Sequence, residues 1–150
     1  MRAVFRFLFV IPFGFIAACL AAAFALLSPF LDVGGAGVDP LFWIETGFGF
    51  TVQAGQVGSA ALVPWGIFMA VTEVLALRSI LLHAGAGALG GIAYAGMAYG
   101  GAMPQASVRT ALVVAGLSFA LVYWLVAGRR AGSWRERAPA APVTSVPPVS

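Results

Sequence analysis

Four apolar stretches, each long enough to cross a lipid bilayer, fill most of the 150-residue sequence. A bilayer core about 30 Å thick needs about 20 helical residues at about 1.5 Å each. The stretches cover residues 7–27, 57–77, 80–100 and 110–127. They lack the polar–apolar alternation of barrel strands, and in lipid only helices and closed barrels satisfy every backbone amide. The sequence therefore predicts an all-α integral membrane protein, a bundle of four transmembrane helices.

The composition agrees with a chain that lies in lipid. Hydrophobic residues make up 61% of the sequence and charged residues only 9%, whereas ordinary soluble domains carry about 25% charged residues. The net charge of +3 does not indicate nucleic-acid binding, because the arginines lie at the ends of the apolar stretches, where membrane topology accounts for them. All basic residues are arginine, and alanine and glycine are abundant. This bias is typical of GC-rich bacterial genomes, so we expect a bacterial inner membrane protein.

The arginines also predict the orientation in the membrane. Arg2 and Arg6 precede the first stretch, Arg78 lies between the second and the third, and four arginines follow the last. Because cytoplasmic segments carry the excess of basic residues, both termini are expected in the cytoplasm, which requires an even number of spans. The long loop after the first stretch carries three acidic and no basic residues, as expected of a periplasmic segment. Arg109 is the one arginine on the outer side of this topology.

A helix start is predicted within the periplasmic loop. Asp39 suits the N-cap position and Pro40 the first helical position, and Gly47 is a natural stop. We therefore expect a short interfacial helix over residues 40–46, where Trp43 and the neighbouring phenylalanines suit the membrane surface. A cation site formed by the acidic residues of the loop is an alternative, although their spacing matches no calcium loop.

The first stretch also has features of a cleavable N-terminal signal. Residues 16–19 (IAAC) resemble a lipobox, and residues 23–25 (AFA) would pass as an ordinary signal-peptidase site. However, the apolar run continues past Cys19 to Leu27, whereas a mature lipoprotein usually turns polar after its cysteine. We prefer an uncleaved helix in which Cys19 is a small apolar residue, and a single cysteine excludes an internal disulfide.

The third stretch is rich in glycine. Gly87 and Gly91, and likewise Gly96 and Gly100, are four residues apart, a small-xxx-small spacing that lets helix backbones approach closely. The first stretch carries a matching stripe of alanines. Packing within one molecule is the preferred interpretation and homo-oligomerisation the alternative. Residues 85–90 also match the dinucleotide motif G-x-G-x-x-G, but they lie in a membrane span and no acidic residue follows about 20 positions on, so nucleotide binding is rejected.

Two ionisable residues flank the predicted turn between the second and third stretches. Glu73 lies five residues before Arg78, and His83, the only histidine, lies five residues after it. A tight helical hairpin would set both at the same depth, where they could pair. Acids and histidines within the membrane often mark proton or ion paths. The alternatives are a functional Glu73–His83 pair and two side chains that simply reach the cytoplasmic interface.

The sequence changes character after the fourth stretch, which divides a transmembrane domain (1–128) from a cytoplasmic tail (129–150). Prolines among small residues predict disorder from residue 138 onward. The preceding basic segment is expected to contact lipid headgroups through Arg129, Arg130, Arg135 and Arg137.

Motifs of catalysis are not found in the sequence, which has no Walker loop, no nucleophile elbow and no His-rich metal cluster. Neither a cofactor nor a metal is expected. The sequence favours a non-enzymatic scaffold or accessory subunit that packs, within the lipid bilayer, through small-residue faces against another membrane protein or a second copy. The alternative is a small oligomeric transporter or channel that uses Glu73 and His83.

Overall fold

The computed structural model describes residues 2–31, 40–102 and 104–132, and within these ranges every regular element is a helix. The predicted all-α class is confirmed, and four helical stretches are long and apolar enough to cross a membrane. The elements in chain order are α1 (Arg2–Phe5), the π-helical turn η1 (Arg6–Val10), α2 (Ile11–Leu27), η2 (Ser28–Phe30), α3 (Pro40–Leu75), α4 (Ile80–Ala98), α5 (Ala106–Val126) and η3 (Gly128–Arg130).

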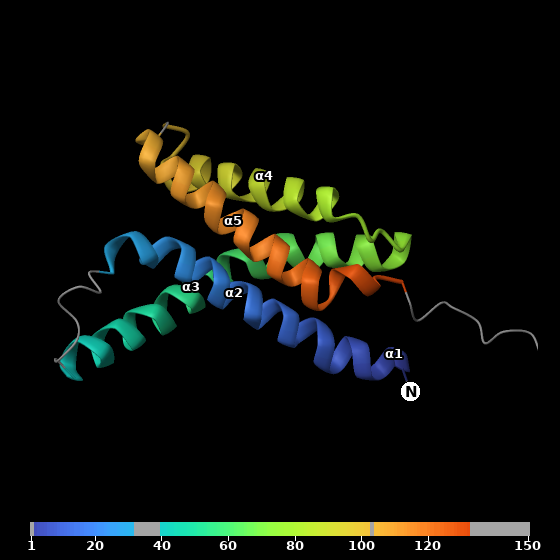
Figure 1. Ribbon diagram of the computed structural model, residues 1–150. Coiled ribbons are helices and arrows are strands. Elements are labelled where there is room, and N and C mark those ends of the chain that lie inside the picture. The colour runs from blue at the N-terminus through green and yellow to red at the C-terminus, as the bar shows by residue number, and fades with distance from the viewer. Residues whose placement is uncertain (1, 32–39, 103, 133–150) are drawn as a thin grey trace, which may run out of the picture.

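Helix α5 is the central element of the bundle (Figure 1). It packs along α4 on one side and against α2 on the other, and α2 in turn packs against α3. The start of the chain, the connection between α3 and α4 and the end of α5 all lie at one end of the bundle. We call this the terminal end. An even number of long helices brings the start of the chain and the end of α5 to the same end of the bundle.

Close contact between α4 and α5 depends on glycine. A Cβ atom built on Gly87 would clash with the carbonyl oxygen of Gly116, and one built on Gly91 would lie 2.5 Å from the carbonyl oxygen of Leu112. Backbone atoms cannot move aside as flexible side chains do, so only glycine fits at these positions. In lipid, such close backbone approach supplies the van der Waals contact that holds helices together.

The other two glycines of the predicted pattern have different roles. No atom of a neighbouring element lies within 4 Å of a Cβ built on Gly96. Gly100 has φ +60° and ends α4: the Gly101 N–H donates to the Gly96 carbonyl oxygen at 2.8 Å, and the Gly100 N–H donates to Met97 at 3.3 Å. This pair of bonds is a Schellman cap, which requires the left-handed conformation that glycine adopts without strain.

The structure corrects the prediction for residues 40–46. The helix starts at Pro40, as predicted, but it does not stop at Gly47 and continues to Leu75 as one helix of 36 residues. A glycine inside a helix costs only about 1 kcal/mol, whereas unsatisfied backbone groups in lipid cost several kcal/mol each. A lone glycine without a following proline or polar turn therefore did not end the helix. At about 1.5 Å per residue α3 is about 54 Å long, well beyond the thickness of a bilayer core.

Candidate functional site: a buried polar cluster

Arg6 and Glu73 form a buried ion pair at the terminal end. The two residues are 6% and 3% exposed. Both Nε and Nη2 of Arg6 donate to Oε1 of Glu73, with the Nε contact at 3.1 Å. Arg6 Nη2 also donates to the carbonyl oxygen of Ala127 at 2.8 Å, and Glu73 Oε2 accepts the Gly132 backbone N–H at 2.8 Å. One ion pair thus joins the start of the chain, the end of α3 and the residues after α5.

The position of the guanidinium suits the end of a helix. The last carbonyl groups of α5 have no partner within their own helix and carry partial negative charge, which favours a cation beside them. Arg6 supplies that cation through its bond to Ala127. Glu73 compensates the charge of Arg6, so neither charge is left unpaired in a medium where an isolated ion is very unfavourable.

The π-helical turn explains why Arg6 faces inward. The buried residues Ile11, Gly14 and Ala18 follow one another at spacings of three and four, as on one face of an α-helix. Arg6 precedes Ile11 by five residues, the spacing of a π-turn, and η1 spans Arg6–Val10. In a regular α-helix of about 100° per residue, that spacing would turn Arg6 about 140° away from Ile11. The extra residue in η1 therefore restores Arg6 to the buried face.

A second set of bonds holds the turn after α5 against the connection between α3 and α4. Arg78 Nε donates to the Ala131 carbonyl oxygen at 2.8 Å, and Trp124 Nε1 donates to the Arg78 carbonyl oxygen at 2.8 Å. We call the bonds of Arg6, Glu73 and Arg78 to residues 127–132 the terminal clamp. Each bond of the terminal clamp joins segments that are far apart in the sequence.

Two residues beside the bonds of the terminal clamp have left-handed backbone conformation. Ala76 has φ 53° directly after α3, where Leu77 N–H donates to the Thr72 carbonyl oxygen at 2.9 Å. Gly132 has φ +72°, and a Cβ atom built on it would clash with the side chain of Ala76. Glycine at position 132 therefore permits both the backbone conformation and the contact with α3.

His83 is fully buried beside the terminal clamp. Its Nδ1 lies 2.9 Å from the Ser79 carbonyl oxygen, which can only accept, so Nδ1 carries the proton in this contact. Its Nε2 has no hydrogen-bond partner within the described ranges, and neither does Nε1 of Trp65. The rings of Trp65, Phe68 and Tyr123 surround the imidazole, with centroids 5.2 to 6.4 Å away.

The sequence-predicted residues Glu73 and His83 thus lie at the same end of the bundle without a hydrogen bond between them. Both Glu73 oxygens are used by Arg6 and Gly132, and His83 Nδ1 faces Ser79. At 3% and 0% exposure neither side chain reaches the surface, which also differs from the interfacial alternative. In the sequence alone, Arg6 is explained by membrane topology. The sequence feature that could have indicated the ion pair is that Arg6 carries the opposite charge and is expected at the same membrane depth as Glu73.

The remaining predicted residues fall into two groups. Arg129 and Arg130 are exposed on η3, whereas Arg135 and Arg137 lie outside the described residues. Asp32 and Asp39, from the alternative cation site, are likewise outside the described ranges. Among the residues that the structure describes, no group of three metal-ligating side chains lies together.

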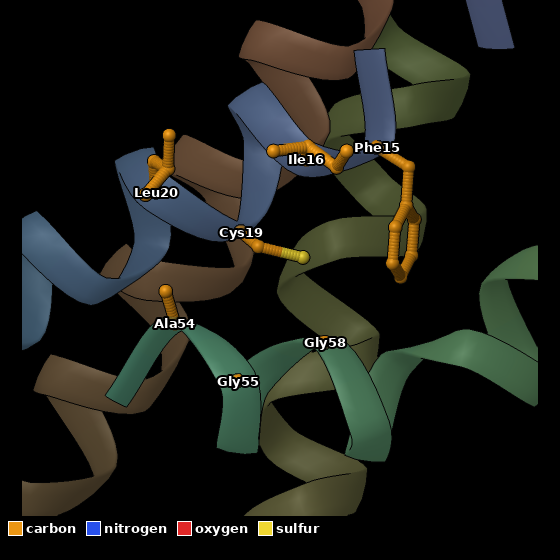
Figure 2. A pocket seen from close by; sticks show the side chains of 7 residues that line it. All are labelled: Phe15, Ile16, Cys19, Leu20, Ala54, Gly55 and Gly58. Atoms are coloured by element: carbon orange, nitrogen blue, oxygen red, sulfur yellow. The ribbon is translucent and has the colours of Figure 1, made fainter. Parts of the chain in front are cut away.

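Cys19 lies at the crossing of α2 and α3, where its sulfur is 3.3 Å from a Cβ built on Gly58. It lines an open apolar groove of about 260 Å³ between the two helices (Figure 2). The groove is lined by Phe15, Ile16, Cys19, Leu20, Ala54, Gly55 and Gly58. The apolar run past Cys19 is a continuous helix to Leu27, and the uncleaved N-terminus stays a prediction.

Comparison with known proteins does not assign the chain to a family. Neither a family model, a curated protein nor a solved structure matches the chain.

Proposed function

We propose that this protein is a non-enzymatic membrane scaffold or accessory subunit, which packs against another membrane-spanning helix through the first half of α3. The observation that carries the proposal is the exposure of this segment. The buried residues of α3 are Trp65, Thr72 and Glu73, so residues 40–64 contain none. In Figure 1 the first half of α3 extends away from α4 and α5.

A row of small residues marks the exposed face of α3. Gly47, Thr51, Gly55 and Ser59 follow one another at a spacing of four, and all four are exposed. The Thr51 hydroxyl donates to the Gly47 carbonyl oxygen at 2.8 Å, so its donor is satisfied within α3. No atom lies within 4 Å of a Cβ built on Gly47 or Gly55. The same type of spacing brings α4 and α5 into backbone contact within this molecule, which supports its use with a partner.

The chemistry of the terminal clamp supports a structural rather than a transporting role for Glu73. A carboxylate that accepts bonds from Arg6 and from the Gly132 amide is already neutralised and fully hydrogen-bonded. Such a group holds segments together and offers no free charge to a passing ion.

A second candidate is a small oligomeric transporter or channel in which Glu73 and His83 line the path. The observation that favours it is the buried Nε2 of His83, a polar atom without a hydrogen-bond partner within the described ranges. Leaving such a group unsatisfied costs about 1–3 kcal/mol, and intramembrane histidines often serve in proton transfer. For this candidate, flux of protons or ions through proteoliposomes would be lost in His83→Gln.

The location that fits both candidates is a bacterial inner membrane with both termini in the cytoplasm. The positions of the arginines support this orientation. Reporter fusions at Gly37 and Ser150 should show opposite sidedness, and the same side for both would refute the four-span topology.

The scaffold proposal is tested by photo-crosslinking in cells. A photoreactive amino acid at Thr51, on the exposed face of α3, should form adducts with a second copy or with another membrane protein. At Leu89, which is 67% exposed on α4, the same probe should form adducts with lipid alone. Gly47→Leu should abolish the protein adduct at Thr51, whereas Gly90→Leu on α4 should leave it unchanged. Lipid adducts alone at both positions would refute the proposal.

A further inference from the structure

We propose that the partner of α3 is a second copy of this chain, held by hydrogen bonds between the Gln56 side chains of the two copies. The inference rests on the proposed function and names the partner of that same helix. Gln56 lies near the middle of α3, a helix long and apolar enough to cross a membrane. A glutamine amide carries two N–H donors and a carbonyl acceptor, and lipid supplies a partner for none of them.

The amide of Gln56 has no hydrogen-bond partner among the residues that the structure describes. Gln56 is exposed, and the bond it makes to a side chain uses its backbone carbonyl oxygen, which accepts the Ser59 hydroxyl at 2.9 Å. Gln53, three positions earlier and half-buried, likewise has no side-chain partner within these ranges. The hydroxyls of Thr51 and Ser59 are satisfied by the backbone of α3. Two amides therefore remain to be satisfied by another molecule.

Gln56 lies on the side of α3 that faces away from its own bundle. Gly58 faces α2, because a Cβ atom built on it would lie 3.3 Å from the sulfur of Cys19. Two residues correspond to about 200° of helical rotation, which places Gln56 on the opposite side. Val52 and Val63, four positions before and seven after Gln56, lie on the same side and are 44% and 67% exposed. We call this surface of Val52, Gln56 and Val63 the Gln56 face, and its spacing is typical of a helix–helix interface.

The chemistry of the amide favours a second copy as the partner. A carboxamide both donates and accepts, so two identical amides that face each other satisfy one another with two hydrogen bonds. A dimer with two-fold symmetry places a residue near the axis opposite the same residue of its partner. Glu45, on the same side of α3, is 11 positions earlier, which is about 16 Å of helix. Helices that cross at Gln56 diverge along this length, and the two Glu45 carboxylates stay apart.

Self-association of the full-length protein in lipid tests the inference. Two batches, labelled at the C-terminus with a donor and an acceptor fluorophore, are reconstituted together in phosphatidylcholine vesicles, and energy transfer is followed as added lipid dilutes the protein. The wild type should associate, and Gln56→Leu should weaken association about tenfold, because two hydrogen bonds between membrane helices contribute about this factor. Gln56→Asn is the matched control, since it keeps the carboxamide and should associate like the wild type.

A second readout is disulfide formation between copies. In a Cys19→Ala background, Val52→Cys on the Gln56 face should give a disulfide-linked dimer on oxidation, whereas Leu89→Cys, at a position 67% exposed on α4, should not. A dimer through position 89 in place of position 52 would overturn the inference.

The remaining outcomes separate this inference from the proposed function. Equal association of the wild type and Gln56→Leu would overturn the inference, and so would a loss in Gln56→Asn as large as that in Gln56→Leu. Absence of association between copies would also overturn it. Photo-adducts at Thr51 with a different membrane protein would in that case leave the proposed function standing, whereas lipid adducts alone would remove both.

Discussion

At the scale of single residues, the terminal clamp depends on Gly132. Its backbone N–H donates to Glu73, its φ of +72° is left-handed, and a Cβ atom built on it would clash with Ala76. An alanine here would adopt an unfavourable conformation that costs about 1–2 kcal/mol, and its methyl group would clash with α3 in addition. Both costs arise from the single Cβ atom that alanine adds.

Gly132→Ala should therefore lower the free energy of unfolding by about 1–3 kcal/mol, measured by chemical denaturation in a mild detergent. Gly85→Ala is the matched control, because Gly85 is helical and no atom lies within 4 Å of the added Cβ. This control should be neutral or stabilising by up to about 1 kcal/mol, since alanine is the better helix former. Equal stability of the two variants would contradict the role assigned to Gly132.

At the scale of elements, the contact between α4 and α5 can be tested by comparing two adjacent glycines, Gly91 inside the contact and Gly90 outside it. Gly91→Ala places a methyl group against the backbone of Leu112 and should destabilise the bundle by about 1–3 kcal/mol. Gly90→Ala, one position away, points into open space and should be neutral or slightly stabilising. Thermal melting of both variants in one detergent measures the difference. A loss for Gly90→Ala as large as that for Gly91→Ala would mean that close backbone contact is not what joins these helices.

The role of the π-helical turn η1 can be tested by deleting or inserting one residue rather than by changing a side chain. Deletion of Leu8, which is 63% exposed, would convert the turn into a regular α-turn and keep Arg6 on the buried face. This variant should melt close to the wild type. Insertion of one alanine after Leu8 would instead rotate Arg6 by about 100° away from Glu73, and should be as destabilising as Arg6→Gln. Melting curves of the deletion and insertion variants that coincide would contradict this role of η1.

Some of these elements could be predicted from the sequence and others could not. The spans were predictable because about 20 apolar residues in a row have few alternatives to a helix in lipid. The predicted end of the helix at Gly47 was wrong, because one glycine inside a helix costs less free energy than the unsatisfied backbone groups of an interrupted helix. The partner of Glu73 was not predictable from spacing, since Arg6 lies 67 positions earlier and faces inward only through a π-turn. Gly116 was not among the predicted packing residues, although it faces Gly87 across the contact between α4 and α5.

At the scale of the whole molecule, the two ends of the bundle differ in construction. The terminal end is closed by bonds among the start of the chain, the end of α3 and the turn after α5. The first half of α3 has no buried residue and diverges from α4 and α5. An end closed by hydrogen bonds and an exposed helix face support the proposed subunit that presents one surface to a partner. Under that proposal, Glu73 stabilises the fold.

A pair of double-mutant cycles tests most directly whether Glu73 is a structural residue. One cycle combines Arg6→Gln with Glu73→Gln, the other His83→Gln with Glu73→Gln, and the free energy of unfolding is measured for each variant in one detergent. Removal of either member of the buried ion pair should cost about 3–5 kcal/mol, because it leaves the other charge unpaired. The Arg6–Glu73 cycle should then show an interaction energy of about 0.5–3 kcal/mol, and the His83–Glu73 cycle should be additive within about 0.5 kcal/mol. Additivity for Arg6 and Glu73 together with strong coupling between His83 and Glu73 would contradict the structural role and favour the transporter.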